Sequence, residues 1–429
     1  HCHKKSRAYL NPWVAGYRQK KGWADTAKDR SADELSHWTR STLSYAKDFS
    51  EGKIAPVWVA DGKGGLEHVC GFGQDFVWFK YPLQGNFSVE WETPGNNNNF
   101  ADVAYNDLRI TPRADSQFWY LTAGSSNRYG YMRSKVVSEE WNRCKYVVDD
   151  EHFSIFLNDT LVYQEPRSSE AAWFGVHAYG SRTSRIRGLA FEGSPEIPNQ
   201  LDLIPTKGLR GWTAGYFGGA TPSPGFSTEH REKEANKPTF YRDEIDRESV
   251  DQLSWTVNEE RELVSGRQKN YGHQNQNVIQ YQRPICDGDT LSYEFFYEEG
   301  KTEVSPSIGR VAYVLRPAGL QLHWMNAGST SWKIPAAYEV PVPGVEPKPL
   351  PLKSGEWNQM ELVRDGDTLK MKLNGETIFQ QQPRSRLGDM VFGLFHYRDQ
   401  SSARVRNIVL TGNWPEQLPE DLFDFDSEE

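Results

Sequence analysis

The stretch "NQMELVRDGDTLKMKLNGETIF", residues 358–379, decides the fold class. Apolar and polar side chains alternate along it, which is typical of strands that bury one face. The turn sequences "DGD" at 365–367 and "NG" at 374–375 divide it into three short runs. Because Asp-Gly and Asn-Gly favour tight hairpins, the stretch predicts three consecutive antiparallel strands.

The same pattern occurs earlier in the chain, in "NRCKYVVDDEHFSIFLNDTLVY" at 142–163. Other stretches recur in the same order: Trp-x-Ala-Gly-Tyr starts at 13 and 212, "EWN" at 140 and 356, "WFGVHAY" at 173 matches "VFGLFHY" at 391, and "RIRGLAFEG" at 185 matches "RVRNIVLTG" at 404. An ordered series of matches is expected when a whole domain is duplicated. The sequence therefore predicts an all-β chain of two tandem antiparallel β-sandwich domains with jelly-roll topology and few short helices.

The matches also set the expected domain boundaries. We expect an N-terminal extension at 1–12, repeat one at 13–193, a linker at 194–211, repeat two at 212–412 and a mobile acidic C-terminal tail at 413–429. Helical periodicity is strongest in "SADELSHWTRSTLSYAKDF" at 31–49 and "RDEIDRESVDQLSW" at 242–255. These two stretches predict one short helix in each repeat.

Composition and charge exclude several classes of function. The 429 residues carry a net charge of −9 and contain no run of lysine and arginine, so nucleic acid is not an expected partner. No stretch approaches the roughly 18 apolar residues that a membrane-spanning helix needs, so we expect no membrane insertion. The four cysteines lie far apart in no zinc-like spacing, and the motifs of serine hydrolases and phosphate loops are missing.

The end of repeat two carries a family resemblance. Its Trp-Asn at 357, Asn-Gly at 374, "FGLFHY" at 392–397 and "RVRNIVLTG" at 404–412 resemble the end of laminin-G-like and 3-keto-disaccharide hydrolase-type domains, which have the concanavalin-A-like jelly roll. The doubled chain is also similar to an uncharacterised domain family in large secreted proteins of sugar-degrading bacteria. The resemblance implies a carbohydrate or glycoconjugate partner and a secreted, periplasmic or cell-surface protein whose signal peptide has been removed. It implies no single activity, because this fold hosts lectins, enzymes and adhesion modules.

Alternation separates the two faces of each strand and so selects candidate site residues. The face opposite the predicted core carries, in repeat one, Glu90, Trp119, His177 and Tyr179, and in repeat two, Glu294, His323, Phe395 and Tyr397. Aromatic rings mixed with a few polar groups are what a sugar site requires. The sequence therefore predicts glycan binding, unless these faces pack on loops, on the other repeat or on other protein chains in a larger extracellular assembly.

Two further hypotheses concern chemistry and charge. Glu90, His177 and Tyr179 could abstract a proton next to a sugar carbonyl, as in a keto-sugar hydrolase or lyase, whereas one carboxylate per face argues against an ordinary glycosidase. Four arginines, Arg185, Arg187, Arg404 and Arg406, could clamp a carboxylate or sulfate of an acidic glycan, or could cover an edge strand with charge.

Two other features are assigned from the sequence. The recurring tryptophans at 141 and 357 are expected to be structural core residues. The stretch "GNNNNFADVAYND" at 95–107 offers oxygen ligands for one Ca²⁺, or forms a solvated turn.

Overall fold

The computed structural model describes residues 20, 35–43, 57–60, 64–70, 74–95, 101–113, 118–123, 127–133, 137–168, 170–179, 184–206, 208–215, 239–240, 255–267, 276–325, 339–383, 390–420 and 422. The 30 elements named in these ranges are all strands, and the central strands pair in antiparallel fashion. This confirms the predicted all-β fold class. Within the described part of the chain, no helix is long and apolar enough to cross a membrane.

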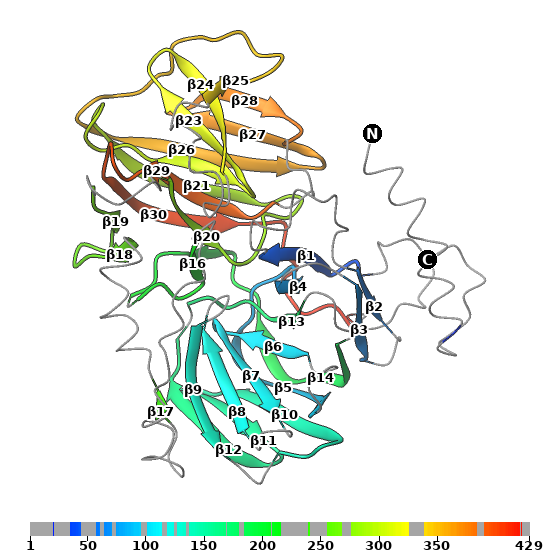
Figure 1. Ribbon diagram of the computed structural model, residues 1–429. Coiled ribbons are helices and arrows are strands. Elements are labelled where there is room, and N and C mark those ends of the chain that lie inside the picture. The colour runs from blue at the N-terminus through cyan, green and yellow to red at the C-terminus, as the bar shows by residue number, and fades with distance from the viewer. Residues whose placement is uncertain are drawn as a thin grey trace.

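Two sheets made mainly from the first half of the chain pack face to face (Figure 1). The sheet that we call the β4 sheet contains, in spatial order, β1 (Trp38–Leu43), β4 (Gln74–Phe79), β13 (Gly175–Tyr179), β6 (Asp102–Tyr105), β7 (Leu108–Arg113), β8 (Phe118–Ala123), β9 (Asn127–Arg133) and β17 (Thr239–Phe240). The β5 sheet contains β12 (Thr160–Pro166), β11 (His152–Leu157), β10 (Trp141–Val148), β5 (Gln84–Pro94), β14 (Arg185–Glu196), β3 (Leu66–Cys70) and β2 (Val57–Ala60). Together they form the first sandwich.

Two sheets from the second half form a second sandwich, drawn above the first in Figure 1. The β20 sheet contains β16 (Trp212–Gly215), β20 (Gln276–Tyr281), β29 (Phe392–Tyr397), β22 (Ser305–Ile308), β23 (Val311–Arg316), β24 (Gly319–Trp324) and β25 (Glu339–Pro341). The β21 sheet contains β18 (Trp255–Val257), β19 (Leu263–Ser265), β30 (Ala403–Thr411), β21 (Thr290–Tyr297), β26 (Glu356–Asp365), β27 (Thr368–Leu373) and β28 (Glu376–Gln381), and β15 (Gln200–Asp202) also pairs with β30. The strands β26, β27 and β28 are the meander predicted from residues 358–379.

The strand order of the first sandwich recurs in the second. In the β20 sheet, β16 is the edge strand next to β20, and its Trp212 lies opposite Tyr281. In the β4 sheet, β1 is the equivalent edge strand, and its Trp38 lies opposite Phe79. By position, Trp212 therefore corresponds to Trp38, whereas Trp13 lies outside the described residues. The boundaries of the two repeats and their descent from one duplicated domain stay predictions.

The strand β1 also corrects the helix expected at 31–49. Its Trp38 is buried and packs edge-on against Phe79, with ring centroids 5.4 Å apart, and against Phe174 at 6.0 Å. Burial of this large ring and pairing with β4 outweigh the local helical periodicity. Of the helix expected at 242–255, only Trp255 is described, and it begins β18.

A buried polar contact joins the two sandwiches. Trp173 lies just before β13, and its indole Nε1 donates a 2.7 Å hydrogen bond to the Tyr281 hydroxyl of the second sandwich. The guanidinium of Arg283 lies 4.5 Å from the Trp173 ring centroid and donates to the Lys80 carbonyl at 2.5 Å. Arg283 also forms a buried ion pair with Asp289. The sandwiches therefore share a packed interface rather than a simple linker.

Segments that cross between the sandwiches add to this interface. The strand β15 lies within the expected linker, yet it pairs with β30 of the second sandwich. The strand β17 follows β16 in the chain but pairs with β9 of the first sandwich. The expected tail is also ordered where it is described, since Trp414 packs against both core clusters and Leu422 is buried in that of the first sandwich.

Candidate functional site

The predicted alternation of faces is correct for the strands that carry Glu90 and Glu294. In β5, Phe87, Val89 and Trp91 are buried in the core of the first sandwich, and Glu90 points the opposite way and is partly exposed. Glu294 also points outward from β21, but it lies opposite Arg406 as Glu92 lies opposite Arg187, so it corresponds to Glu92 and not to Glu90. Both glutamates therefore lie on the outer face of the β5 and β21 sheets.

His177 lies on the other sheet of the first sandwich. It points away from the core residue Val176 on β13, is fully buried, and has its Nδ1 3.1 Å from Asp102 Oδ2. Its ring is 4.6 Å from that of Phe76. Burial lowers the pKa of His177 to about 4, and the nearby Arg109 guanidinium acts in the same direction.

This placement corrects the predicted catalytic group. Glu90 and His177 lie on opposite outer faces of one sandwich, with both sheets and the core between them. They cannot contact one substrate atom together. The backbone of Tyr179 ends β13 and that of Trp119 lies in β8, but their side chains fall outside the described part.

In the second sandwich, three of the predicted residues do come together. On the outer face of the β20 sheet, the His323 ring stacks on Phe395 with centroids 5.4 Å apart and meets Tyr397 edge-on at 5.3 Å. All three are buried, and burial raises the pKa of the Tyr397 phenol. Glu294 is not part of this cluster, because it lies on the other sheet.

A buried aromatic cluster has little surface left for a ligand. At its border, the sequence prediction missed Arg316, which lies 5.9 Å from the Tyr397 ring centroid and forms ion pairs with Glu339 and Glu303. Alternation along "VAYVLR" at 311–316 could have placed it on this face.

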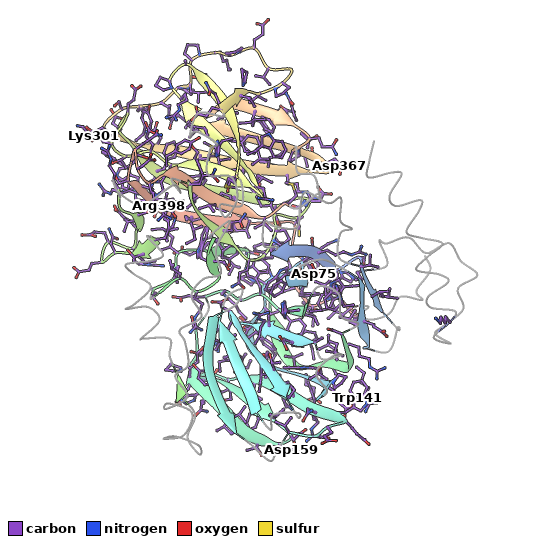
Figure 2. The ribbon with its side chains drawn as sticks, in the orientation of Figure 1. Asp75, Trp141, Asp159, Lys301, Asp367 and Arg398 are labelled. Carbon is purple, nitrogen blue, oxygen red and sulfur yellow. The ribbon has the colours of Figure 1, made fainter. Side chains whose placement is uncertain are left out.

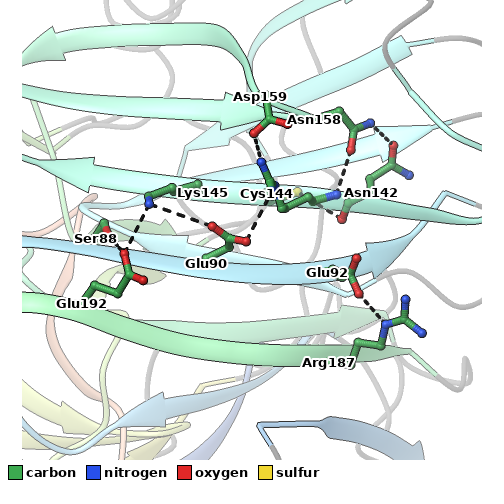
Figure 3. A network of polar contacts seen from close by, with 11 residues as sticks. Ser88, Glu90, Glu92, Asn142, Cys144, Lys145, Asn158, Asp159, Arg187 and Glu192 are labelled. Atoms are coloured by element: carbon green, nitrogen blue, oxygen red, sulfur yellow. Dashed lines mark hydrogen bonds and ion pairs between the residues drawn. The ribbon is translucent and has the colours of Figure 1, made fainter.

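The partly exposed candidates lie on the outer faces of the β5 and β21 sheets. In the first sandwich, the guanidinium of Arg187 lies 3.8 Å from the Trp141 ring centroid and that of Arg185 lies 5.0 Å from it. Arg187 also forms a 2.5 Å ion pair with Glu92, on the strand next to it (Figure 3). Trp141 lies toward the outer end of this sandwich, away from the second one (Figure 2).

The second sandwich repeats this arrangement around Trp357. Arg406 lies 4.0 Å from the Trp357 ring centroid, and Arg404 lies 5.2 Å from it. Phe296 adds a second ring, 5.7 Å from Trp357 and edge-on to it. Arg406 forms a 2.6 Å ion pair with Glu294, the glutamate selected from the sequence. We call the two groups the Trp141 cluster (Trp141, Arg185, Arg187, Glu92) and the Trp357 cluster (Trp357, Phe296, Arg404, Arg406, Glu294).

These clusters correct two expectations. Trp141 and Trp357 are partly exposed and do not belong to the core, since the inward positions on their strands are those of Cys144 and Met360. The arginines do not cover edge strands either, because β14 and β30 have neighbours on both sides. Counting alternation back from Cys144 would have placed Trp141 outside.

Charged side chains extend this surface in the first sandwich (Figure 3). Glu90 lies 3.7 Å from Arg143 and 3.9 Å from Lys145, and Lys145 lies 3.5 Å from Glu192. Arg143 also forms an ion pair with Asp159. Exposed pairs of this kind contribute roughly 0–1 kcal/mol each, so the row is a polar surface and not a source of stability.

The predicted calcium stretch is described only at its ends. Asp102 is bonded to His177, Asp107 to Gln282, and Asn106 to Glu165. Residues 96–100 lie outside the described part. The calcium hypothesis stays a prediction for those residues.

Comparison with known proteins gives two family matches. Residues 271–417 match DUF1583_N, a domain of unknown function, and residues 145–251 match DUF1581, a protein family of unknown function. No curated protein matches the chain.

Solved structures that are similar to parts of the chain include two bacterial proteins and one human protein. The carbohydrate-binding module CBM66 of Bacillus subtilis is 12% identical, with a TM-score of 0.25, over 35% of this chain and 94% of the module. A putative glycosyl hydrolase of Parabacteroides distasonis is 13% identical, with a TM-score of 0.24, over 37% and 83%. A variant of human galectin-16 is 10% identical, with a TM-score of 0.23, over 31% and 94%. Each match covers about a third of this chain.

Proposed function

We propose that this protein binds a glycan or polysaccharide through the Trp141 and Trp357 clusters. The observation that carries the proposal is the recurrence, on the outer face of each sandwich, of a partly exposed tryptophan with two arginines across its ring and a glutamate beside them. The aromatic candidates that the sequence placed on the β4 and β20 sheets are buried wherever their side chains are described.

The chemistry of these clusters suits saccharides. An indole ring offers an apolar face to sugar C–H groups, guanidinium N–H groups donate to hydroxyl and carboxylate oxygens, and glutamate accepts from hydroxyl groups. Because the side chains project from neighbouring strands of one sheet, their spacing is fixed before a ligand arrives. This limits the entropy that binding costs.

A binding role suits the geometry better than the enzyme hypothesis. Proton abstraction by Glu90 with His177 as its partner requires both groups at one sugar, and they lie on opposite faces of the sandwich. A location outside the cell remains part of the proposal from the sequence, and fractionation of the source cells tests it.

The test is a glycan panel probed with the intact chain and three variants. We expect Trp141→Ala and Trp357→Ala each to weaken binding of the selected glycan by about tenfold, since central aromatic anchors typically dominate binding energy. Asp367→Asn, at an exposed turn of the second sandwich, is the matched control and should bind as the parent does (Figure 2). If the parent binds no glycan of the panel, the proposal is wrong. Large stable oligomers would then favour an assembly role.

A further inference from the structure

The two clusters differ in the charge around one arginine. In the second sandwich, Glu262 accepts two hydrogen bonds from Arg404, at 2.9 Å from Nε and 2.8 Å from the terminal Nη2. This is the two-pronged geometry in which guanidinium and carboxylate fit best. The Arg404 guanidinium holds the pKa of Glu262 below its ordinary value. Arg404 is therefore neutralised within its own domain.

The equivalent arginine of the first sandwich lacks this carboxylate. The pairing of β14 with β3 places Arg185 opposite Glu67, as the pairing of β30 with β19 places Arg404 opposite Val264. By this register, the position of Glu262 is taken in the first sandwich by Gly65, which has no side chain. The Nε of Arg185 is buried without a hydrogen-bond partner.

The neighbouring acidic groups do not replace Glu262. Glu92 is bonded to Arg187, which is the other arginine of the cluster. Glu67 lies directly across the ladder from Arg185, yet within the described ranges no carboxylate forms an ion pair with Arg185. What Arg185 does contact is the face of Trp141. A guanidinium that lies over an aromatic ring keeps N–H groups that can donate to an acceptor.

We propose that Arg185 binds a carboxylate or sulfate of the glycan, so that the ligand of the first sandwich is an acidic saccharide. The inference rests on the proposed glycan-binding function and names its ligand class. The second sandwich supplies the model for the contact, because the acidic group of the ligand takes the part that the Glu262 carboxylate plays for Arg404. The second sandwich, whose Arg404 is already neutralised, has no equivalent anion site.

Paired saccharides that differ only in charge test this inference. The probes are oligogalacturonides and their carboxyl-reduced neutral counterparts, together with chondroitin and chondroitin sulfate, measured by calorimetry at low and moderate salt. We expect the parent to prefer the charged member of at least one pair by about tenfold or more, with the preference reduced by salt. Arg185→Gln should abolish the preference, because it weakens binding of the charged member by about tenfold more than binding of the neutral member.

A gain-of-function variant provides a second, independent readout. Glu262→Gln removes the carboxylate from Arg404 and should create an additional anion site, seen as a second equivalent of bound acidic saccharide. Arg404→Gln in the same chain should remove that equivalent. Both variants retain a polar side chain of similar size, so misfolding is checked by their unfolding midpoints.

The outcomes separate the two proposals. Equal affinity for charged and neutral members, unaffected by Arg185→Gln, would overturn the acidic-ligand inference and leave glycan binding in place. No binding of either member by the parent, together with a silent glycan panel, would overturn both. Selective loss of the charged member in Arg185→Gln supports both.

Discussion

Asn374 donates a 2.8 Å hydrogen bond from Nδ2 to Oδ1 of Asn358, and the same bond, at 2.9 Å, joins Asn158 to Asn142 in the other sandwich. Each turn asparagine also accepts from the backbone N–H of the residue after its partner. In each sandwich, the asparagine of the Trp-Asn pair is therefore hydrogen-bonded to the asparagine of the Leu-Asn pair. We call this contact the asparagine clamp, and it joins the first strand of the meander to the second turn.

Removal of this clamp should destabilise either sandwich to a similar degree. We expect Asn358→Ala to lower the free energy of unfolding by about 1–3 kcal/mol, because it leaves buried backbone groups and the Asn374 amide without partners. Asn142→Ala is the matched variant in the first sandwich. Urea unfolding measures both. A change below about 0.5 kcal/mol in either variant would contradict the assigned role.

The contact between Trp173 and Tyr281 should couple the two sandwiches. We expect Tyr281→Phe to lower the free energy of unfolding by about 1–3 kcal/mol, since the buried indole N–H loses its acceptor. Trp173→Phe removes the donor, and the double variant should cost less than the sum of the two single changes. Calorimetry of the parent should show one transition, whereas two well-separated transitions would contradict a shared interface.

Burial of His177 predicts a stability that depends on pH. Its pKa of about 4 in the folded protein lies below the ordinary 6.5, so the folded state binds fewer protons than the unfolded state between these values. Stability should therefore fall as the pH drops from about 6.5 to about 4, by about 3 kcal/mol from this group. Phe76, Asp102 and Arg109 face the ring, and the charge of Arg109 strengthens the effect.

A His177→Gln variant checks the assignment of this pH dependence. It should flatten the fall in unfolding free energy between pH 6.5 and 4. A residual slope of the same sign is expected from His396, whose pKa burial lowers to about 3. An unchanged slope in His177→Gln would show that other groups cause the dependence.

The glycine of the "FG" motif is predicted to be required for steric reasons. A Cβ atom on Gly393 would lie 2.5 Å from Ser307 Oγ and 2.7 Å from the Ile279 carbonyl oxygen. Gly393→Ala should therefore destabilise the protein by about 1–3 kcal/mol, as overpacking commonly does. Gly266→Ala is the control, because a Cβ there would have no neighbour within 4 Å. Equal unfolding midpoints for the two variants would refute the steric explanation.

Alternation in the sequence predicted the strands and the inward side chains, but not the sheet to which each strand belongs. It placed Glu90 and His177 correctly on outward faces, then combined them into one site. The spatial order puts β13 between β4 and β6, and β14 beside β5. Such pairings depend on contacts between residues far apart in the chain, which a local period cannot encode. The helix predicted around Trp38 was wrong for the same reason, because the strand that replaces it forms only by pairing with β4.

The two tryptophans of the Trp141 and Trp357 clusters were missed as site residues for a different reason. A recurring tryptophan suggests a core residue, and alternation counted from Cys144 or Met360 was needed to place it outside. The absent carboxylate at Gly65 becomes visible only when the registers of β3 and β19 are compared. Neither difference produces a motif that can be recognised in a single sequence.

The burial of Leu422 in the core of the first sandwich has a consequence for biosynthesis. A ribosome releases the strands of the first sandwich long before it reaches this residue, so that core stays incomplete while the second sandwich is being made. Domains of a nascent chain usually fold one after another from the N-terminus. Here completion of the first sandwich must wait for the return of the segment around Leu422, and until then its unfinished core exposes apolar surface that a chaperone can recognise.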